Sequence, residues 1–397
     1  MTAIVLYDDD RARKFEPFAL TRPVGELRAG ALLIRERWAR ALGMPASGFI
    51  GAKHLSSFDE QGAPNAVDGI ARGAIVANSR FAPSLAAADP GAARWLCGGR
   101  VAAVRLAGDL MPNDLHRGTV ALDAVPAADG SDAEIGGWWL DDVWQPIARL
   151  GEMLIDDLPR LGGEMRRLGS GEAIIIGGHP VFVEEGATIE PQSCFDVTLG
   201  PVMVRAGATV QAFTRVVGPC YIGEHSQVSG DRVSGCSIGP HCRVHGEISA
   251  TVLLGYANKG HDGFVGHSYL GRWTNLGAET VTSNLKNTYS TVSLWTPDGV
   301  RDTKMQFLGT LFGDHAKTGI NVPLNTGTVI GAGASVVAAM PPKVVAPFAF
   351  GDGKTVKTYQ LEKFLEVAAR VMARRSVVLS ERGRELLAAS HAARWKA

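Results

Sequence analysis

Cysteine is scarce in this chain and follows no ligand pattern. Its five copies among 397 residues include no CxxC pair and do not alternate with histidine at the spacing of zinc ligands. The sequence therefore offers neither a zinc finger nor a thioredoxin-like redox motif, and we expect reduced thiols in the core or on the surface. These cysteines are Cys97, Cys194, Cys220, Cys236 and Cys242.

Net charge and long apolar runs are also missing. Basic and acidic residues number 40 each, so the formal net charge of zero favours neither nucleic acid nor an anionic membrane as a partner. No apolar stretch reaches the roughly 20 residues that span a bilayer, and residues 1–10 do not resemble a signal peptide. We therefore expect a cytoplasmic protein. The N-terminal segment also contains no Walker P-loop and no GxGxxG motif.

The sequence is rich in glycine, with 48 residues, and in its C-terminal half an apolar residue returns at every sixth position. A strand alternates with a period of two and a helix with 3.6, so neither keeps one residue in six pointing inward over such a length. A β-helix does, because short strands stack coil on coil around one apolar axis. The two uninterrupted runs are Val204, Val210, Val216, Ile222 and Val228, and Phe312, Thr318, Leu324, Ile330 and Val336.

The length of the chain predicts more than one domain. Residues 1–160 are expected to form an α/β domain, since short apolar runs end in polar loops and alternate with helical stretches. Residues 175–350 carry the repeat and predict the β-helix, with a long excursion at 283–307 where the repeat vanishes. Residues 355–397 predict a helical tail. The expected strands of the first domain cover residues 3–7, 73–77 and 100–106, and its helix covers 31–42.

Polar residues concentrate at two places in the repeat, 255–263 and 313–321. Histidine is the side chain best suited to accept a proton near neutral pH, so His261 is the first candidate for a general base. Asn275 and Asn284 could contact sugar hydroxyls, whereas a turn residue with no chemical role is the alternative for each of these positions. Other histidines, His267 and His315, are interpreted as corner residues. The lysines that could meet a phosphate are Lys259, Lys286 and Lys317.

A second polar cluster follows the first predicted strand. Several arginines there, Arg22 and Arg28 among them, could clamp phosphates, and the acidic run at residues 8–10 could hold a magnesium ion. A salt-bridged surface turn is the alternative interpretation of the same residues.

Five stretches, residues 20–28, 255–263, 275–278, 283–287 and 313–317, give the chain a resemblance to a known family. It resembles the bacterial bifunctional enzymes that make UDP-N-acetylglucosamine, and more closely their alternative branch with a shortened N-terminal domain. The resemblance implies a left-handed parallel β-helix trimer with acetyltransferase sites between subunits. It also implies an N-terminal nucleotidyltransferase domain that binds a nucleoside triphosphate and a sugar 1-phosphate with Mg²⁺.

The resemblance also implies roles for single residues. His261 would be the base that accepts a proton from the sugar amine as it attacks acetyl-CoA, and Asn275 and Asn284 would contact the amino sugar. Lys259, Lys286, Arg22 and Arg28 would serve as further substrate contacts, and Asp109, or else Asn78, would stand near the metal position. The residues expected to line the acetyl-CoA groove are Ala278, Asp314, Lys317 and Ala332.

The chain also departs from that family. Phe264 stands where the longer branch has a tyrosine, the sugar-binding lysine has no counterpart at the same spacing, and Arg22 replaces a phosphate-binding lysine. The leading hypothesis is acetylation of an amino-sugar 1-phosphate, such as glucosamine 1-phosphate, with nucleotidyl transfer from a triphosphate such as UTP. Two alternatives stay open: an acyltransferase of single activity with a vestigial N-terminal domain, and a catalytically silent trimer that binds a nucleotide sugar as a scaffold.

Overall fold

The computed structural model describes residues 3–110, 115, 117–337, 340–351 and 357–395. The chain folds as two compact units, the first running to Gln145 and including Leu379–Ala393, and the second covering Pro146–Val378 with the last four residues. The tail is therefore divided, because α5 (Leu361–Ala373) belongs to the second unit and α6 (Glu381–Ala393) to the first. Residue 355, the predicted start of that tail, lies outside the described residues.

The first unit is built on a six-stranded sheet in the order β4-β1-β5-β8-β7-β9. Its apolar run Ile4–Tyr7 is fully buried, as the sequence predicts, and pairs in parallel with β4 and β5. The bounds of these strands are β1 Ile4–Tyr7, β4 Ala46–Ile50, β5 Ile75–Asn78, β7 Arg94–Cys97, β8 Arg100–Arg105 and β9 Asp132–Glu134. The remaining elements are β2 Arg28–Ala29, β3 Leu32–Leu33, α1 Ile34–Leu42, β6 Phe81–Pro83 and β10 Gly137–Trp139.

The direction of β8 decides which polar loops meet. It runs antiparallel to β5, with Ile75 opposite Arg105 and Ala77 opposite Ala103. The loop after β8 therefore lies at the amino end of β5, whereas the loops after β1 and β5 share the opposite edge of the sheet. That opposite edge holds the carboxyl ends of the adjacent parallel strands β4, β1 and β5, where ligands of α/β sheets bind.

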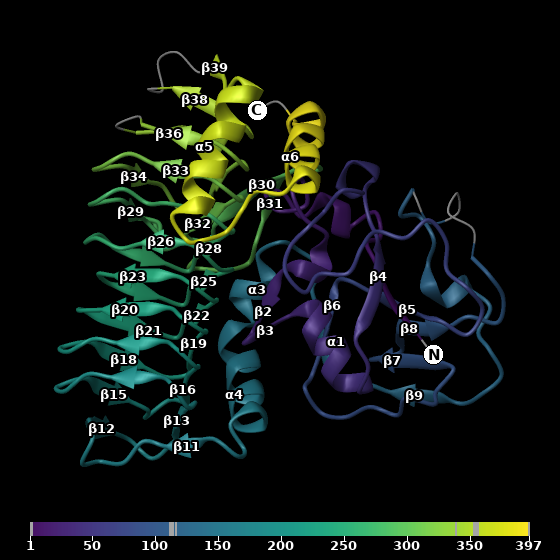
Figure 1. The fold of residues 1–397 in the computed structure, drawn as a ribbon, viewed down its shortest axis with the longest axis horizontal. Helices are drawn as coiled ribbons and strands as arrows, with labels where there is room; N and C mark the ends of the chain where they lie inside the picture. Colours follow the sequence, from purple (N-terminus) through teal and green to yellow (C-terminus); the bar gives the residue numbers. More distant parts are fainter. Residues whose placement is uncertain (1–2, 111–114, 116, 338–339, 352–356, 396–397) are drawn as a thin grey trace. The chain divides into compact units, whose positions relative to one another are not determined.

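The second unit is a β-solenoid, which confirms the β-helix predicted from the six-residue repeat (Figure 1). Short strands stack in parallel on three faces, and one sheet alone contains ten strands. The helices α3 (Gln145–Ala148) and α4 (Leu150–Leu161) come directly before it.

The solenoid strands are grouped by sheet. The first sheet holds β11 Arg166–Arg167, β13 Val181–Val183, β16 Val202–Val204, β19 Cys220–Ile222, β22 Ser237–Ile238, β25 Val252–Leu253, β28 Tyr269–Leu270, β32 Thr310–Phe312, β35 Thr328–Ile330 and β37 Val344–Val345. The second holds β12 Ile174–Ile176, β15 Cys194–Asp196, β18 Arg215–Val217, β21 Arg232–Ser234, β24 Ile248–Ser249 and β27 Val265–Gly266. The third holds β14 Thr188–Ile189, β17 Thr209–Val210, β20 Gln227–Ser229, β23 Arg243–His245 and β26 Asn258–Lys259. Later coils add β29 Val281–Thr282 with β34 Pro323–Leu324, and β33 Lys317–Thr318 with β36 Ser335–Val336, β38 Ala349–Gly351 and β39 Lys357–Thr358.

The residues of the repeat point into the solenoid. On the third sheet Val210 pairs with Val228, Val228 with Val244, and Val244 with Lys259, and all four are buried. Burial of one such aliphatic side chain stabilises the fold by roughly 1.5–3 kcal/mol. Lys259 thus occupies a position that valine takes in the coils before it.

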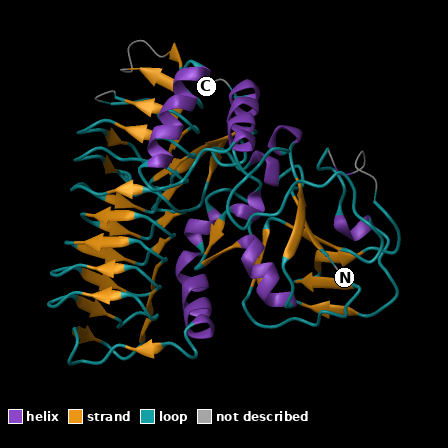
Figure 2. Ribbon diagram, in the orientation of Figure 1, coloured by secondary structure: helices purple, strands orange, loops and turns teal. Residues whose placement is uncertain are grey.

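Two segments lie outside the regular coils (Figure 2). The excursion predicted at 283–307 contains an antiparallel hairpin of β30 (Ser293–Thr296) and β31 (Gly299–Asp302). Helix α5 lies on the last coils, where Phe364 meets Phe348 edge to face at 4.9 Å between ring centroids. In the part of the chain that the structure describes, no helix has the length and apolar character to cross a membrane.

Candidate functional site

Two aspartates directly follow β1 at the sheet edge that also receives the end of β5. Asp8 is buried, and its Oδ2 accepts a hydrogen bond from the Val24 N–H at 3.1 Å. Among the described residues its Oδ1 has no hydrogen-bond partner. Burial raises the pKa of Asp8 to about 6, although neighbouring donors oppose the shift.

The second aspartate, Asp9, is tied to arginine. Arg80 donates to Asp9 Oδ1 from Nε at 2.8 Å and to Oδ2 from Nη2 at 2.6 Å, and Asn78 donates to Oδ2 at 3.0 Å. Burial disfavours the charged carboxylate, but these bonds and the Arg80 charge outweigh it and lower the pKa of Asp9. Arg80 also pairs with Asp141 at 2.6 Å, and Asp141 is bound in turn by Arg100.

A cavity of about 290 Å³ opens beside this network. Trp139 forms part of its wall, and the Arg100 guanidinium lies 3.8 Å from the centroid of that indole ring. The pocket is therefore flanked by an aromatic face, two arginines and two aspartates. Its lining residues are Asp9, Asn78, Arg80, Gly99, Arg100, Val101, Val120, Ala121, Leu122, Asp123 and Trp139.

The two arginines predicted to bind substrate are buried in the first unit. Arg22 is 1% exposed and forms a two-pronged ion pair with Glu60, with N–O distances of 2.8 and 3.2 Å. Arg28 is 4% exposed and donates to the carbonyl of Ala31. Neither is among the residues that line the cavity beside Asp9.

The predicted metal residue, Asp109, lies at the opposite edge of the sheet, beside the amino end of β5. It is exposed, follows β8 and accepts a hydrogen bond from the Arg72 N–H at 2.7 Å. The described residues contain no group of three or more histidine, cysteine, aspartate or glutamate side chains placed to hold a metal ion. Because Arg80 already binds both oxygens of Asp9, these residues do not fit the Mg²⁺ that the resemblance implies.

In the solenoid, Asn275 belongs to a column of outward-facing residues on the third sheet. Its Oδ1 accepts a hydrogen bond from Asn258 Nδ2 at 2.8 Å, and its backbone bridges to Asn258 on one side and Lys317 on the other. Lys317 Nζ donates to the carbonyl of His315 at 3.0 Å, and burial lowers the pKa of Lys317 to about 8. Asn258, Asn275 and Lys317 thus lie one above another on consecutive coils.

Lys259 and His261 are joined through the backbone. Lys259 is 1% exposed, and its Nζ donates to the carbonyl of His245 at 2.7 Å and to that of His261. Burial lowers the pKa of Lys259 to about 8. His261 itself is exposed, and its imidazole makes no hydrogen bond within the described residues. Lys259 therefore fastens the turn that carries His261 instead of reaching toward solvent.

Asn284 pairs with a different histidine, His267. Its Nδ2 lies 2.9 Å from His267 Nδ1, and the imidazole stacks on Phe307 with 5.3 Å between ring centroids. Burial lowers the pKa of His267, so the neutral imidazole prevails at pH 7. His267 is one of the histidines that the sequence suggested to be a corner residue. The sequence signal that links His267 to Asn284 is the length of one coil. The two residues are 17 positions apart, as are Asn258 and Asn275, and each pair is joined by a hydrogen bond between adjacent coils.

The other predicted site residues have separate surroundings. Lys286 donates to the carbonyl of Thr291 inside the excursion. Asp314 is 3% exposed and accepts a backbone hydrogen bond at 2.8 Å, and Ala332 is fully buried. Ala278 is half-buried. Within the described part of one chain, the contacts of the predicted residues therefore do not bring them all together.

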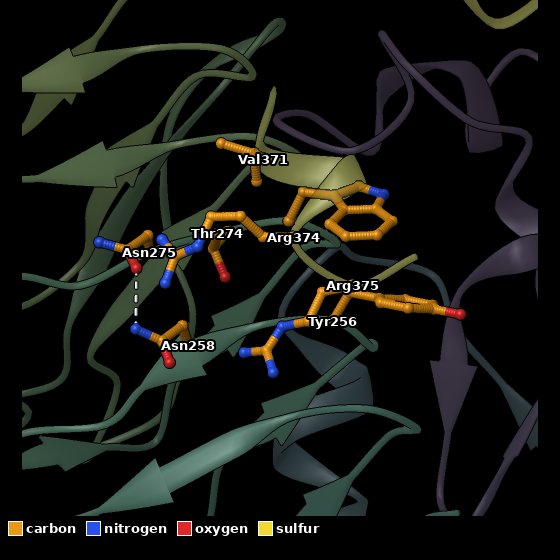
Figure 3. A pocket seen from close by; sticks show the side chains of 8 residues that line it. Tyr256, Asn258, Thr274, Asn275, Val371, Arg374 and Arg375 are labelled. Atoms are coloured by element: carbon orange, nitrogen blue, oxygen red, sulfur yellow. Dashed lines mark hydrogen bonds between the residues drawn. The ribbon is translucent and has the colours of Figure 1, made fainter. Parts of the chain in front are cut away.

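A small cavity of about 50 Å³ lies between the asparagine column and the end of α5 (Figure 3). Arg374 and Arg375 extend from the helix end toward Asn275 and Asn258. Its lining residues are Tyr256, Asn258, Trp273, Thr274, Asn275, Val371, Arg374 and Arg375.

Comparison with known proteins finds a family match at the N-terminal end of the chain and several relatives. Residues 4–165 match a family model described as "Sugar nucleotidyl transferase". The chain is 28% identical over 205 residues to "Bifunctional protein GlmU" of Desulfitobacterium hafniense, covering 43% of this chain and 40% of that protein. It is 30% identical over 162 residues to the protein of that name in Bartonella quintana, covering 39% and 31% respectively.

A solved structure of AntD, an N-acyltransferase from Bacillus cereus, is similar with a TM-score of 0.21 and 14% identity, covering 53% of this chain and 99% of that one. The chain spans less than half of the length of the two GlmU proteins, 40% and 31%. The resemblance to the bifunctional family is nevertheless confirmed: residues 4–165 match the sugar nucleotidyl transferase model, and the chain is similar to GlmU proteins over part of its length.

Proposed function

We propose that the solenoid transfers an acetyl group from acetyl-CoA to the amine of an amino-sugar 1-phosphate, with glucosamine 1-phosphate as the first candidate acceptor. The observation that carries this proposal is the pair of His267 and Asn284, a half-buried neutral imidazole held by an amide on the next coil. A neutral imidazole with a lowered pKa is available as a base at physiological pH.

In the proposed step the amine nitrogen attacks the thioester carbon, a C–N bond forms, and the C–S bond breaks. His267 takes the proton that the nitrogen loses, and that proton is returned to the thiolate to give free CoA. With the Asn284 amide as it lies, Nδ1 of His267 accepts the hydrogen bond and Nε2 bears the proton. Rotation of this amide by about 180° would present its oxygen to Nδ1 and free the lone pair of Nε2.

His261 stays the base predicted from the sequence, and the geometry favours His267 over it. His267 is fixed by a hydrogen bond and a ring stack, whereas the His261 imidazole is exposed without a polar partner among the described residues. A general base has to be held within hydrogen-bond reach of the proton that it takes. The fixed imidazole of His267 meets this requirement better than the exposed imidazole of His261.

Release of free thiol from acetyl-CoA in the presence of glucosamine 1-phosphate tests the proposal. We expect His267→Ala to lower kcat by roughly 10²–10⁴-fold and His261→Ala to have a much smaller effect. The reverse order of effects would assign the base to His261. A wild-type chain that releases no thiol with any amino-sugar phosphate would contradict acetyl transfer.

We also propose nucleotidyl transfer from a triphosphate such as UTP to the sugar 1-phosphate in the first unit. The family match over residues 4–165 and the cavity beside Asp9 and Arg80 support it. Release of pyrophosphate from UTP and N-acetylglucosamine 1-phosphate, measured with and without added Mg²⁺, is the direct test.

One observation favours the alternative of a single acyltransferase activity. Arg80 binds both oxygens of Asp9, so the carboxylate nearest the cavity wall is already paired with a guanidinium. Thiol release without pyrophosphate release would establish that alternative. Binding of a nucleotide sugar with neither activity would establish the silent scaffold.

The proposed assembly is a homotrimer acting in the cytoplasm on sugar phosphate, triphosphate and acetyl-CoA. The separation of the asparagine column from the His267 corner supports an intersubunit site. In such a site one subunit supplies the column and its neighbour the base.

A further inference from the structure

Three arginines gather beside the asparagine column without an acidic partner. Arg374 and Arg375 line the small cavity at the end of α5, and Arg243 is paired in register with Asn258 on the neighbouring coil. Among the described residues, no carboxylate lies within 4 Å of any of these three guanidinium groups. Arg243 donates to the carbonyls of His225 and Cys242, each at 3.0 Å, whereas the partly buried Arg205 is bound to two carboxylates.

The three charges lie close enough to one another to influence pKa values in their surroundings. The pKa of Arg375 is lowered, first by burial and then by the charges of Arg243 and Arg374. The pKa of His241, on the same side of the solenoid, is also lowered by burial and by nearby cations that include Arg243 and Arg375. Like charges held together at a partly buried surface are unfavourable unless a counter-charge is bound there.

The wall of the cavity is rigid and polar. Tyr256 and Trp273 stack at 4.2 Å between ring centroids, which fixes one side. Asn258 and Asn275 supply amide groups on the other, and the Arg374 and Arg375 side chains reach between the two sides (Figure 3). A volume of about 50 Å³ admits a few water molecules or one small anion, and not a whole sugar.

The helix end alone does not explain this arrangement. Cations after the last turn of a helix complement its dipole, and Arg374 follows α5 directly. That effect does not require Arg243, which belongs to a different element, and it does not require a polar cavity. The cluster therefore points to a ligand.

We propose that Arg243, Arg374 and Arg375 form a phosphate-binding site that anchors a substrate of the solenoid next to Asn275. Guanidinium groups suit this role because they bind phosphate with paired hydrogen bonds. The phosphate can come from the sugar 1-phosphate or from CoA, and both sources share this chemistry. The proposal rests on the proposed acetyl transfer only for the identity of the ligand, because the anion site itself stands on the arginines and the cavity.

Binding of inorganic phosphate, glucosamine 1-phosphate, CoA and dephospho-CoA to the full chain, measured by calorimetry, tests the site. The variant Arg374→Gln/Arg375→Gln should lose roughly tenfold or more in affinity for at least one of the phosphate ligands. Arg243→Gln, which leaves α5 unchanged, should weaken the same ligand. Arg370→Gln is the matched control, because it removes an exposed cation from the same helix, where Arg370 pairs with Glu366 at 2.9 Å.

The ligand affected identifies the source. A loss confined to glucosamine 1-phosphate assigns the site to the sugar phosphate, and a loss for CoA that is absent with dephospho-CoA assigns it to the 3′-phosphate. A loss for CoA and dephospho-CoA alike assigns the pyrophosphate. Unchanged affinity for all four ligands in both variants, with unfolding temperatures equal to wild type, would overturn the site.

Failure of the proposed function gives a different result. If the wild-type chain binds these anions through the three arginines but releases no thiol from acetyl-CoA, the anion site stands and acetyl transfer does not. If thiol release is normal in both variants and their KM values for acceptor and acetyl-CoA are unchanged, the site is refuted while the activity stands.

Discussion

At the residue scale, two ionisable side chains are buried. The sequence pattern does not show that burial makes their charged forms unfavourable. Asp8 follows a buried strand, and Lys259 stands at an inward position of the repeat. Each is pinned by backbone groups, Asp8 by the Val24 N–H and Lys259 by two carbonyl oxygens. Burial shifts both pKa values toward the neutral form, which makes stability depend on pH.

We predict that Asp8→Asn removes a loss of stability between pH 4 and 6. The pKa of Asp8 is about 6 in the folded chain and about 4 when unfolded, so the folded state holds more protons in this window. The unfolding free energy of wild type should therefore fall, relative to the variant, by on the order of 3 kcal/mol as pH rises through it. Urea unfolding at several pH values measures this difference. Asp10→Asn is the control, because Asp10 is exposed, and a flat difference for Asp8→Asn would refute the prediction.

Lys259→Met should show a pH dependence in the opposite direction and at higher pH. The pKa of Lys259 is about 8 in the folded chain and about 10.4 when unfolded, so the unfolded state holds more protons between these values. Relative to the variant, wild type should gain on the order of 3 kcal/mol of unfolding free energy from pH 8 to 10.4. The exposed Lys304 gives the control variant Lys304→Met, for which no such gain is expected. Equal pH profiles of wild type and Lys259→Met would count against a buried ammonium.

At the element scale, the sequence predicts the repeat and not the direction of a single strand. The six-residue period is a property of the residues themselves, so the inward columns of the solenoid follow from it. Whether β8 runs parallel or antiparallel to β5 depends on its connection, which no local pattern encodes. This is why Asp109 was expected near the site and lies at the other edge. Arg22 likewise finds Glu60 through a contact 38 residues apart.

The packing of α5 on the last coils can be tested directly. Phe364 is 2% exposed and contacts Phe348 and His315, and its truncation should cost about 3–5 kcal/mol of helix docking. We expect Phe364→Ala to accelerate amide exchange across Leu361–Ala373 while exchange in the solenoid strands is unchanged. Glu362→Ala, on the exposed side of the helix, is the control. Protection of α5 that survives in Phe364→Ala would show that other contacts hold the helix.

At the scale of the whole molecule, the candidate site is divided in a single chain. The sequence suggests one set of residues, but the structure shows a column at Asn275 and a corner at His267. The sequence could not separate them, because it does not show which neighbour each asparagine meets: Asn284 lies beside His267, whereas Asn275 lies beside Asn258. The proposed trimer would join the two parts.

We predict that the chain forms a trimer through the solenoid and that Ile320→Glu breaks it. Ile320 is 70% exposed and Val337, on the following coil, is 52% exposed, so the two side chains form an apolar pair on adjacent coils that a partner subunit would cover. A charge placed there would remain solvated in a monomer and be desolvated in an interface, so it should dissociate the trimer without unfolding the solenoid. Light scattering should give three times the chain mass for wild type and one for the variant, with unchanged circular dichroism. Val378→Glu, at an 86% exposed position outside the coils, is the control. Thiol release should fall with the trimer if the column of one subunit and His267 of another form the site, and a fully active monomeric Ile320→Glu would show that one chain suffices.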